Sequence, residues 1–129
     1  MADFNEKLNE FNNTKDTTEE FDSSDIENNK VMGILAYISF LVLVPIFGAK
    51  ESKFARFHAN QGLVLLIASV AAGIIIGTLG WLPLIGWTFD IIGVVIEIIT
   101  VVLMVLGIVN AAQGKAKELP VIGSIKILK

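Results

Sequence analysis

The stretch Asn60 to Trp81, NQGLVLLIASVAAGIIIGTLGW, decides the fold because it carries no charge and is apolar on every face of a helix. A soluble core helix shows a polar stripe, whereas a helix that crosses a hydrocarbon core of about 30 Å needs about 20 apolar residues. Upstream, Ser52 is a good N-cap, and Phe54 and Phe57 follow at helical spacing. We therefore expect a membrane-spanning helix over residues 53–81.

Two further apolar runs flank this helix. Val31 to Ala49 has no charge, with Pro45 expected to kink it near its end, and the interior of Phe89 to Gln113 holds one carboxylate, Glu97. The whole chain is 53% hydrophobic and 18% charged with a mean hydropathy of +0.68, which excludes an ordinary soluble enzyme domain. The sequence predicts an all-α membrane protein with three transmembrane helices, at about 31–49, 53–81 and 89–113.

The two ends of the chain are polar. Residues 1–29 hold nine acidic residues, and with the three lysines of the first 30 residues the local net charge is −6. We expect a disordered acidic tail, either simply solvated or serving as a tether that folds on a partner, ahead of a membrane domain over 30–129. The segment after Gln113 has four lysines and is too short to span, so we expect it to lie on the membrane surface.

Basic residues set the expected orientation. Seven lysines and arginines lie in the first loop and in the C-terminal tail, whereas the turn that carries Trp81 and Trp87 has none. Cytoplasmic loops carry the excess of basic residues. We therefore predict a multi-pass protein of the bacterial inner membrane with its C-terminus in the cytoplasm and, for three spans, its N-terminus outside.

The composition argues against several chemistries. The chain has no cysteine and one histidine, so we expect no disulfide, metal site or cofactor, and no serine forms a catalytic triad with His58 and Asp90. The overall charge of −3 averages an acidic tail and a basic body, and it does not indicate a nucleic-acid partner. We predict no enzyme.

Polar residues at the cytoplasmic rim form one candidate site. Residues that begin the second span should lie at the depth where the third span ends, and amides at that depth prefer one another to lipid. They either fasten the two spans together, meet lipid headgroups, or bind a substrate. These five residues, here called the rim cluster, are His58, Asn60, Gln61, Asn110 and Gln113. Beside them, Lys53 and Arg56 are expected to contact headgroups.

Glu97 marks a second candidate site. It falls near the bilayer midplane, where an acidic residue costs on the order of 2.5 to 3.5 kcal/mol, so it should face protein. The same depth is expected for Ser69, Ser39 and Tyr37. Glu97 is then a protonated packing group, a contact to another subunit, or a proton or cation site of a transporter.

Small residues offer a packing surface on the second span. Gly73 and Gly77 are four residues apart, the spacing at which helices pack closely. They could pack within the chain, against Gly93, or join two copies into a homo-oligomer.

Three stretches together resemble a known family. They are DIENNKVM at 25–32, AKESKFARFHANQGLVLLI at 49–67 and GKAKELPVIGSIKI at 114–127, and the most specific part is the set Phe54, Arg56, Phe57, His58, Asn60, Gln61 and Gly62. The chain resembles a family of small bacterial membrane proteins of unknown function, described as similar to the chloroplast import component Tic-twenty. That component is a four-span protein of a translocation channel, whereas three spans are expected here.

Three functions remain open from the sequence. The first is a non-enzymatic accessory or scaffold subunit of a larger membrane complex, which the resemblance links to protein translocation. The second is a small oligomeric transporter or channel that uses Glu97. The third is a protein that binds the lipid bilayer through its basic aromatic loop and tail.

Overall fold

The computed structural model describes residues 6–7, 10 and 14–128, and its named elements are all helical. In chain order they are η1 (Thr18–Glu20), α2 (Ser23–Leu35), η2 (Ser39–Val42), α3 (Leu43–Gly48), α4 (Lys53–Leu79) and α5 (Gly86–Ala112).

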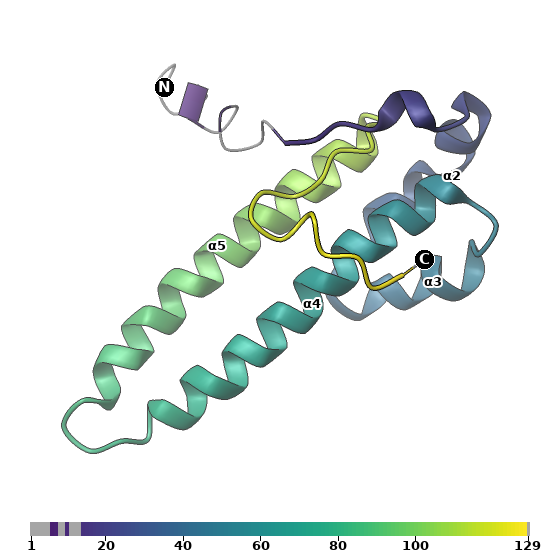
Figure 1. Cartoon of the computed structure of the whole chain (residues 1–129). Helices are drawn as coiled ribbons and strands as arrows, with labels where there is room; N and C mark the ends of the chain where they lie inside the picture. The colour runs from purple at the N-terminus through teal and green to yellow at the C-terminus, as the bar shows by residue number, and fades with distance from the viewer. Residues whose placement is uncertain (1–5, 8–9, 11–13, 129) are drawn as a thin grey trace.

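Helices α4 and α5 form a long antiparallel pair (Figure 1). Each has 27 residues, about 40 Å at 1.5 Å per residue, and each is long and apolar enough to cross a membrane. As expected, α4 begins at Lys53, because the hydroxyl of Ser52 accepts a 3.0 Å hydrogen bond from the backbone N–H of Ala55. Two of the three expected spans are thus present as single helices.

The expected first span is wrong as a continuous helix. Residues 31–49 are divided among the end of α2, a turn, η2 and α3, and Ser39 adopts a φ of +48° in the turn. Pro45 cannot continue an upstream helix, because it has no N–H and its ring collides with the carbonyl four residues before. It is instead the third residue of α3, where proline is tolerated.

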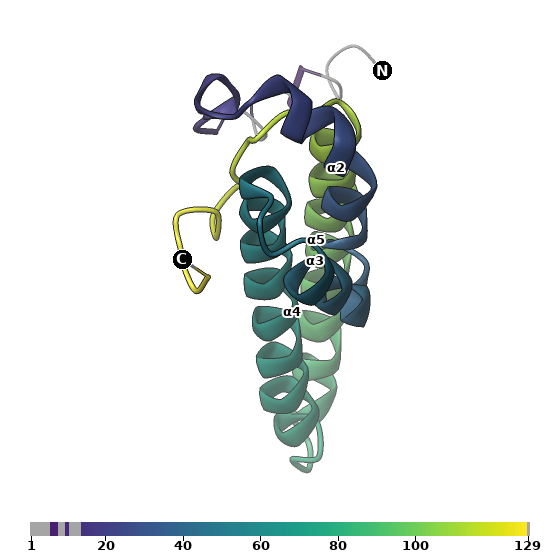
Figure 2. The same cartoon turned by 90° about the vertical axis from the view of Figure 1, so that its right-hand side faces the viewer.

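Residues 23–48 therefore form a short hairpin rather than a span. Its two ends lie together: Asp25, near the start of α2, accepts hydrogen bonds from the Ser52 hydroxyl (2.5 Å) and the Phe54 backbone N–H (2.9 Å). The carboxylate thus sits at the N-terminus of α4, where unpaired N–H groups attract an anion. Figures 1 and 2 show α2 and α3 against one half of the α4–α5 pair, with the other half uncovered by them.

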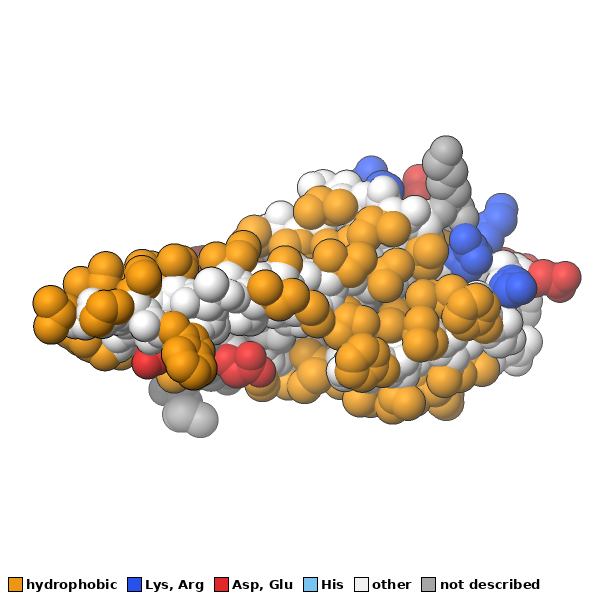
Figure 3. Space-filling view, turned by 90° about the horizontal axis from the view of Figure 1, so that it is seen from below, with side chains coloured by type: hydrophobic (Ala, Val, Ile, Leu, Met, Phe, Trp, Pro, Cys, Tyr) orange, Lys and Arg blue, Asp and Glu red, His pale blue; other side chains and the backbone are white. Residues whose placement is uncertain are grey.

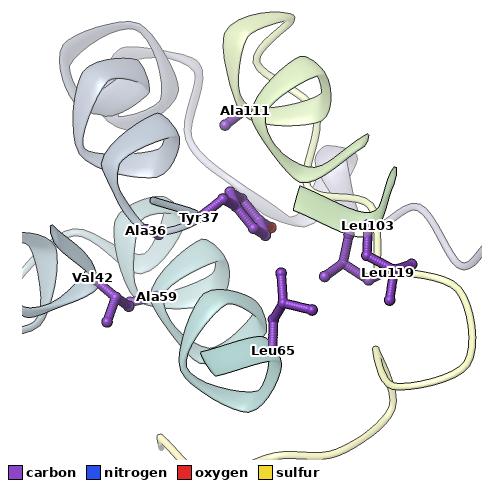
Figure 4. Packing of buried hydrophobic residues seen from close by; sticks show 8 residues of the cluster. All are labelled: Ala36, Tyr37, Val42, Ala59, Leu65, Leu103, Ala111 and Leu119. Carbon is purple, nitrogen blue, oxygen red and sulfur yellow. The ribbon is translucent and has the colours of Figure 1, made fainter. Parts of the chain in front are cut away.

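Two glycines make room between α4 and α5 for the hairpin tip, defined here as Ala36 and Tyr37. A Cβ on Gly62 would lie 1.7 Å from the carbonyl oxygen of Ala36, and one on Gly107 would lie 2.3 Å from the Tyr37 ring. The buried core is built around this tip (Figure 4). Gly62 lies ten residues after Ser52, so the tip reaches roughly 15 Å along the pair.

The described part of the acidic tail differs from the expected disorder. The backbone N–H of Thr17 donates to the carbonyl of Ala116 at 3.0 Å, and that of Glu118 donates to the carbonyl of Lys15 at 3.0 Å. Phe21 packs edge-on against Phe57, with ring centroids 5.8 Å apart. Residues 14–29 are therefore structured, while 1–5, 8–9 and 11–13 lie outside the described residues.

Two segments far apart in the sequence, one before α2 and one after α5, lie side by side. Backbone hydrogen bonds join the segment around Thr17 to that around Ala116, so both lie at the same end of the α4–α5 pair. An N-terminus on the opposite side of the membrane from the C-terminus would need a third crossing, and the described residues contain two helices long and apolar enough for one. The space-filling view shows a surface that is apolar along most of its length, with basic side chains gathered at one end (Figure 3).

Candidate functional site

His58 links the hairpin tip to the chain beyond α5. The side chain is fully buried, with Nε2 at 2.9 Å from the carbonyl oxygen of Lys115 and Nδ1 at 2.6 Å from the hydroxyl of Tyr37. A carbonyl oxygen only accepts, so Nε2 carries the proton and Nδ1 accepts from the tyrosine. Both ring nitrogens of the neutral imidazole are therefore bonded within the chain.

Asn60 and Gln61 hold the C-terminal segment, defined here as residues 114–128. The Gln61 amide donates to the carbonyl of Gly123 at 2.9 Å and accepts from the backbone N–H of Leu119 at 2.8 Å. The Asn60 amide donates to the carbonyl of Ile125 at 2.8 Å. Its oxygen accepts hydrogen bonds from the backbone N–H groups of Ile127 and Leu128. These side chains are 4% and 1% exposed, so they supply backbone partners in a region from which water is excluded.

Three residues of the rim cluster, His58, Asn60 and Gln61, bond the C-terminal segment instead of the end of α5. Asn110 is buried, and its backbone carbonyl accepts from the backbone N–H of Lys115 at 2.8 Å. Gln113 is exposed at the end of α5 and stands apart from the cluster. Amide side chains of α4 fasten the C-terminal segment, and a tail expected on the membrane surface is packed against the helix.

The four residues of the expected intramembrane site do come together. Glu97, Ser69, Ser39 and Tyr37 line one groove of about 380 Å³ between α4, α5 and the hairpin tip. The Ser69 hydroxyl donates to the Leu66 carbonyl at 2.9 Å, so it is bonded within its own helix. Glu97, expected to face protein, lines the groove and is exposed.

Sequence reasoning missed the third cation beside Lys53 and Arg56. These two residues line a cleft of about 440 Å³, and Lys126 of the C-terminal segment lines it from the other side. Its position 70 residues or more beyond them in the chain gave no signal of contact, because the segment is brought to α4 by tertiary hydrogen bonds such as those of Asn60 and Gln61.

The small-residue face of α4 is open. A Cβ on Gly73 or Gly77 would meet no atom within 4 Å, whereas a Cβ on Gly93 of α5 would lie 3.0 Å from the side chain of Ile76. The expected packing of Gly73 and Gly77 within the chain is therefore not formed, and a homo-oligomer through them stays a prediction. Among residues 6–7, 10 and 14–128, no group of three or more His, Cys, Asp or Glu side chains is placed to hold a metal ion.

Comparisons with known proteins place the chain among small membrane proteins. It is 35% identical over 96 residues to the magnetosome protein MamF of Paramagnetospirillum magneticum, which covers 72% of this chain and 78% of that protein. It is 32% identical over 93 residues to the magnetosome protein MmsF of the same organism, covering 71% and 79%. It is 30% identical over 95 residues to the UPF0132 membrane protein of Methanocaldococcus jannaschii, covering 72% of this chain and 64% of that protein.

These comparisons confirm a small membrane-protein family and do not show a similarity to Tic-twenty. No solved structure matches the chain. Residues 28–128, which include the hairpin tip, both long helices and the C-terminal segment, match a single family description. The chain belongs to the magnetosome magnetite crystal formation protein family.

Proposed function

We propose that this protein is a non-enzymatic membrane subunit that acts as a scaffold in a larger membrane assembly. Its relatives MamF and MmsF are named as magnetosome proteins, and the family is described by magnetite crystal formation. By that kinship, the assembly is one that takes part in magnetite crystal formation. The link to protein translocation rests on the resemblance to Tic-twenty alone and stays a prediction.

The proposed topology has two spans, with the hairpin entering the bilayer from the cytoplasmic side and both chain ends in the cytoplasm of a bacterial cell. The stretch from Phe57 to Gly114 has no Lys or Arg. The six basic residues at 50–56 and 115–126 all lie near the end of the pair where α4 begins and α5 ends. The far turn carries Trp81 and Trp87, which are 90% and 64% exposed, as expected of residues in a headgroup layer. Both observations support the orientation, because basic residues favour the cytoplasm and tryptophans favour the interface.

The observation that carries the scaffold proposal is the uncovered half of α4 and α5. Only 17% of the residues in the most apolar stretch of α4 are buried, and only 11% in that of α5. Glu97 lies in the stretch of α5 and is exposed. Lipid can cover the apolar side chains, but an acidic side chain near the midplane costs on the order of 2.5 to 3.5 kcal/mol unless it has a polar partner. Within residues 14–128 no side chain bonds to Glu97, which favours a partner helix from another protein molecule.

Photo-crosslinking in native membranes tests this proposal. A photoreactive amino acid replaces Val101, which lines the groove and lies about 40° around α5 from Glu97, or Ile99, which lies about 200° away. The two positions are matched, since the side chains are 44% and 47% exposed. We expect a protein adduct from Val101 and none from Ile99, with mass spectrometry identifying the partner. Adducts from neither position, or equally from both, would contradict a specific partner at this face.

A small transporter is the second candidate, because the groove of about 380 Å³ brings Glu97 to one wall with Ser69 and Ser39. In proteoliposomes, a transporter predicts a cation or proton flux that Glu97→Gln abolishes while assembly stays intact. A scaffold predicts no flux in either protein, so the same measurement separates the two functions.

A further inference from the structure

A basic cleft lies where the first turns of α4 meet the C-terminal segment. Its volume is about 440 Å³, and three cations line it: Lys53 and Arg56 from α4, and Lys126 from the C-terminal segment. The remaining wall is mainly apolar, with Phe21, Phe57 and Leu128. The basic end of the molecule is visible in Figure 3.

The fold fixes the backbone that carries each cation. Lys53 and Arg56 lie on α4, and hydrogen bonds fix the backbone around Lys126. The Asn60 amide bonds the backbone on either side of Lys126, through the carbonyl of Ile125 and the N–H of Ile127. The ammonium of Lys126 lies 5.6 Å from the centroid of the Phe57 ring and 3.1 Å from a carboxylate oxygen of Glu118. The described residues that line the cleft include these three cations and no acidic side chain.

The mixture of charge and apolar wall selects the class of ligand. Three cations that converge on one space match a phosphate group, which accepts hydrogen bonds from lysine and arginine. The rings of Phe21 and Phe57, edge-on at 5.8 Å, and the side chain of Leu128 offer no partner to a fully hydrated anion. They match the acyl chain of an amphiphile instead.

The depth of the cleft matches a lipid headgroup. Arg56 and Trp81 are 25 residues apart, roughly 37 Å along a helix, which exceeds the hydrocarbon core of about 30 Å and fits within the 40 to 45 Å of a bilayer with its headgroup regions. With Trp81 in the far interface, the cleft lies in the cytoplasmic one.

We propose that this cleft binds one anionic phospholipid, with its phosphate between Lys53, Arg56 and Lys126 and an acyl chain along Phe57 and Leu128. The lipid bridges α4 and the C-terminal segment. The site is independent of the scaffold function and of the partner face near Glu97, which lies on the far half of the pair.

Native mass spectrometry of the full chain in detergent measures this binding directly. The probe is phosphatidylglycerol, titrated against phosphatidylcholine of the same acyl chains and against inorganic phosphate as a competitor. One variant carries Lys53→Gln, Arg56→Gln and Lys126→Gln. The matched control carries Lys50→Gln, Lys115→Gln and Lys117→Gln, which remove the same charge at the same end of the molecule without touching the cleft.

We expect the cleft variant to lose about fivefold in affinity per cation, since each basic residue near an anionic lipid is worth about 1 kcal/mol. The control should stay within about twofold of the parent. Should the triple variant not fold, Lys126→Gln alone, at a side chain that is 55% exposed, should lose about fivefold.

Three results overturn the proposal. Equal losses in the cleft and control variants mean a general attraction between the basic end and anionic lipid. Equal binding of phosphatidylcholine means that the net negative charge of the headgroup is not recognised. Displacement of the lipid by inorganic phosphate at equal concentration means that the ligand is a free anion.

Discussion

Replacing Gln61 by methionine should release the C-terminal segment from α4 and leave the helices in place. The two side chains are similar in volume, so the packing around this buried position changes little. The thioether cannot replace the amide, however. The backbone N–H of Leu119 loses the acceptor at 2.8 Å, and the carbonyl of Gly123 loses the donor at 2.9 Å.

The expected cost follows from two groups left without partners. A single hydrogen bond contributes about 1 kcal/mol net, and a buried group left unsatisfied costs about 1 to 3 kcal/mol. Leu119 is 2% exposed, so its N–H has no water while the segment stays docked. The segment can detach and regain water, which limits the loss, and we expect its docking free energy to fall by about 2 kcal/mol.

Hydrogen exchange at the amide of Leu119 measures this free energy, because the amide exchanges only when the segment opens. A loss of about 2 kcal/mol predicts about 30-fold faster exchange. The matched control is Gln113→Met, which makes the same chemical change at an exposed residue at the end of α5. We expect its exchange to be unchanged.

Unchanged exchange at Leu119 in Gln61→Met would refute the reasoning, because the amide would then not be what docks the segment. Equal acceleration in Gln113→Met would refute it too, since that would reflect a general loosening of the end of the molecule.

The remaining predictions concern topology, the hairpin tip and the start of α4. Cysteines at Ser23 and Ser124, in a chain with no native cysteine, should both be labelled only from the cytoplasmic side, because the segments that carry them belong to the same end of the helix pair. Gly62→Ala should lower the free energy of unfolding in detergent by about 2 kcal/mol or more through overpacking, whereas Gly73→Ala, which meets no atom within 4 Å, should change it by less than about 1 kcal/mol. Asp25→Ala should cost about 1 to 2 kcal/mol in the same assay, because α4 loses the acceptor of two hydrogen bonds at its first turn.

Each of these outcomes has a clear opposite. Labelling of Ser23 from outside would restore a third crossing. Equal effects of alanine at Gly62 and Gly73 would mean that the hairpin tip does not pack on α4. Unfolding of Asp25→Ala at the parent's denaturant midpoint would mean that Ser52 alone caps the helix.

The two long helices were predictable from the sequence because their signal is local. A run that is apolar on every face can be stable only in a membrane or a core, and its length is read directly from the chain. The start of α4 was equally local, since Ser52 caps the third N–H beyond it. The polar residues that require partners, from His58 to Gln61, were identified for the same reason: at that depth such groups do not stay unbonded.

The partners of those residues were decided by the tertiary structure alone. Val31 to Ala49 has the composition of a span, yet it forms a hairpin because Gly62 and Gly107 open a recess that accepts Ala36 and Tyr37. A glycine in an apolar helix looks the same in the sequence whether or not another backbone approaches it, as Gly73 shows.

The sequence by itself determined which residues are apolar enough to enter a membrane, where α4 begins, and which polar groups need partners. Only the tertiary structure decided that the chain turns back at Ser39, that the segments around Thr17 and Ala116 pair with each other, and that Lys126 lines the same cleft as Arg56. The physical reason is that hydrophobicity and capping act over a few neighbouring residues. Hydrogen bonds such as that between Gln61 and Leu119 join positions 58 residues apart, and their register is set by how the whole chain packs.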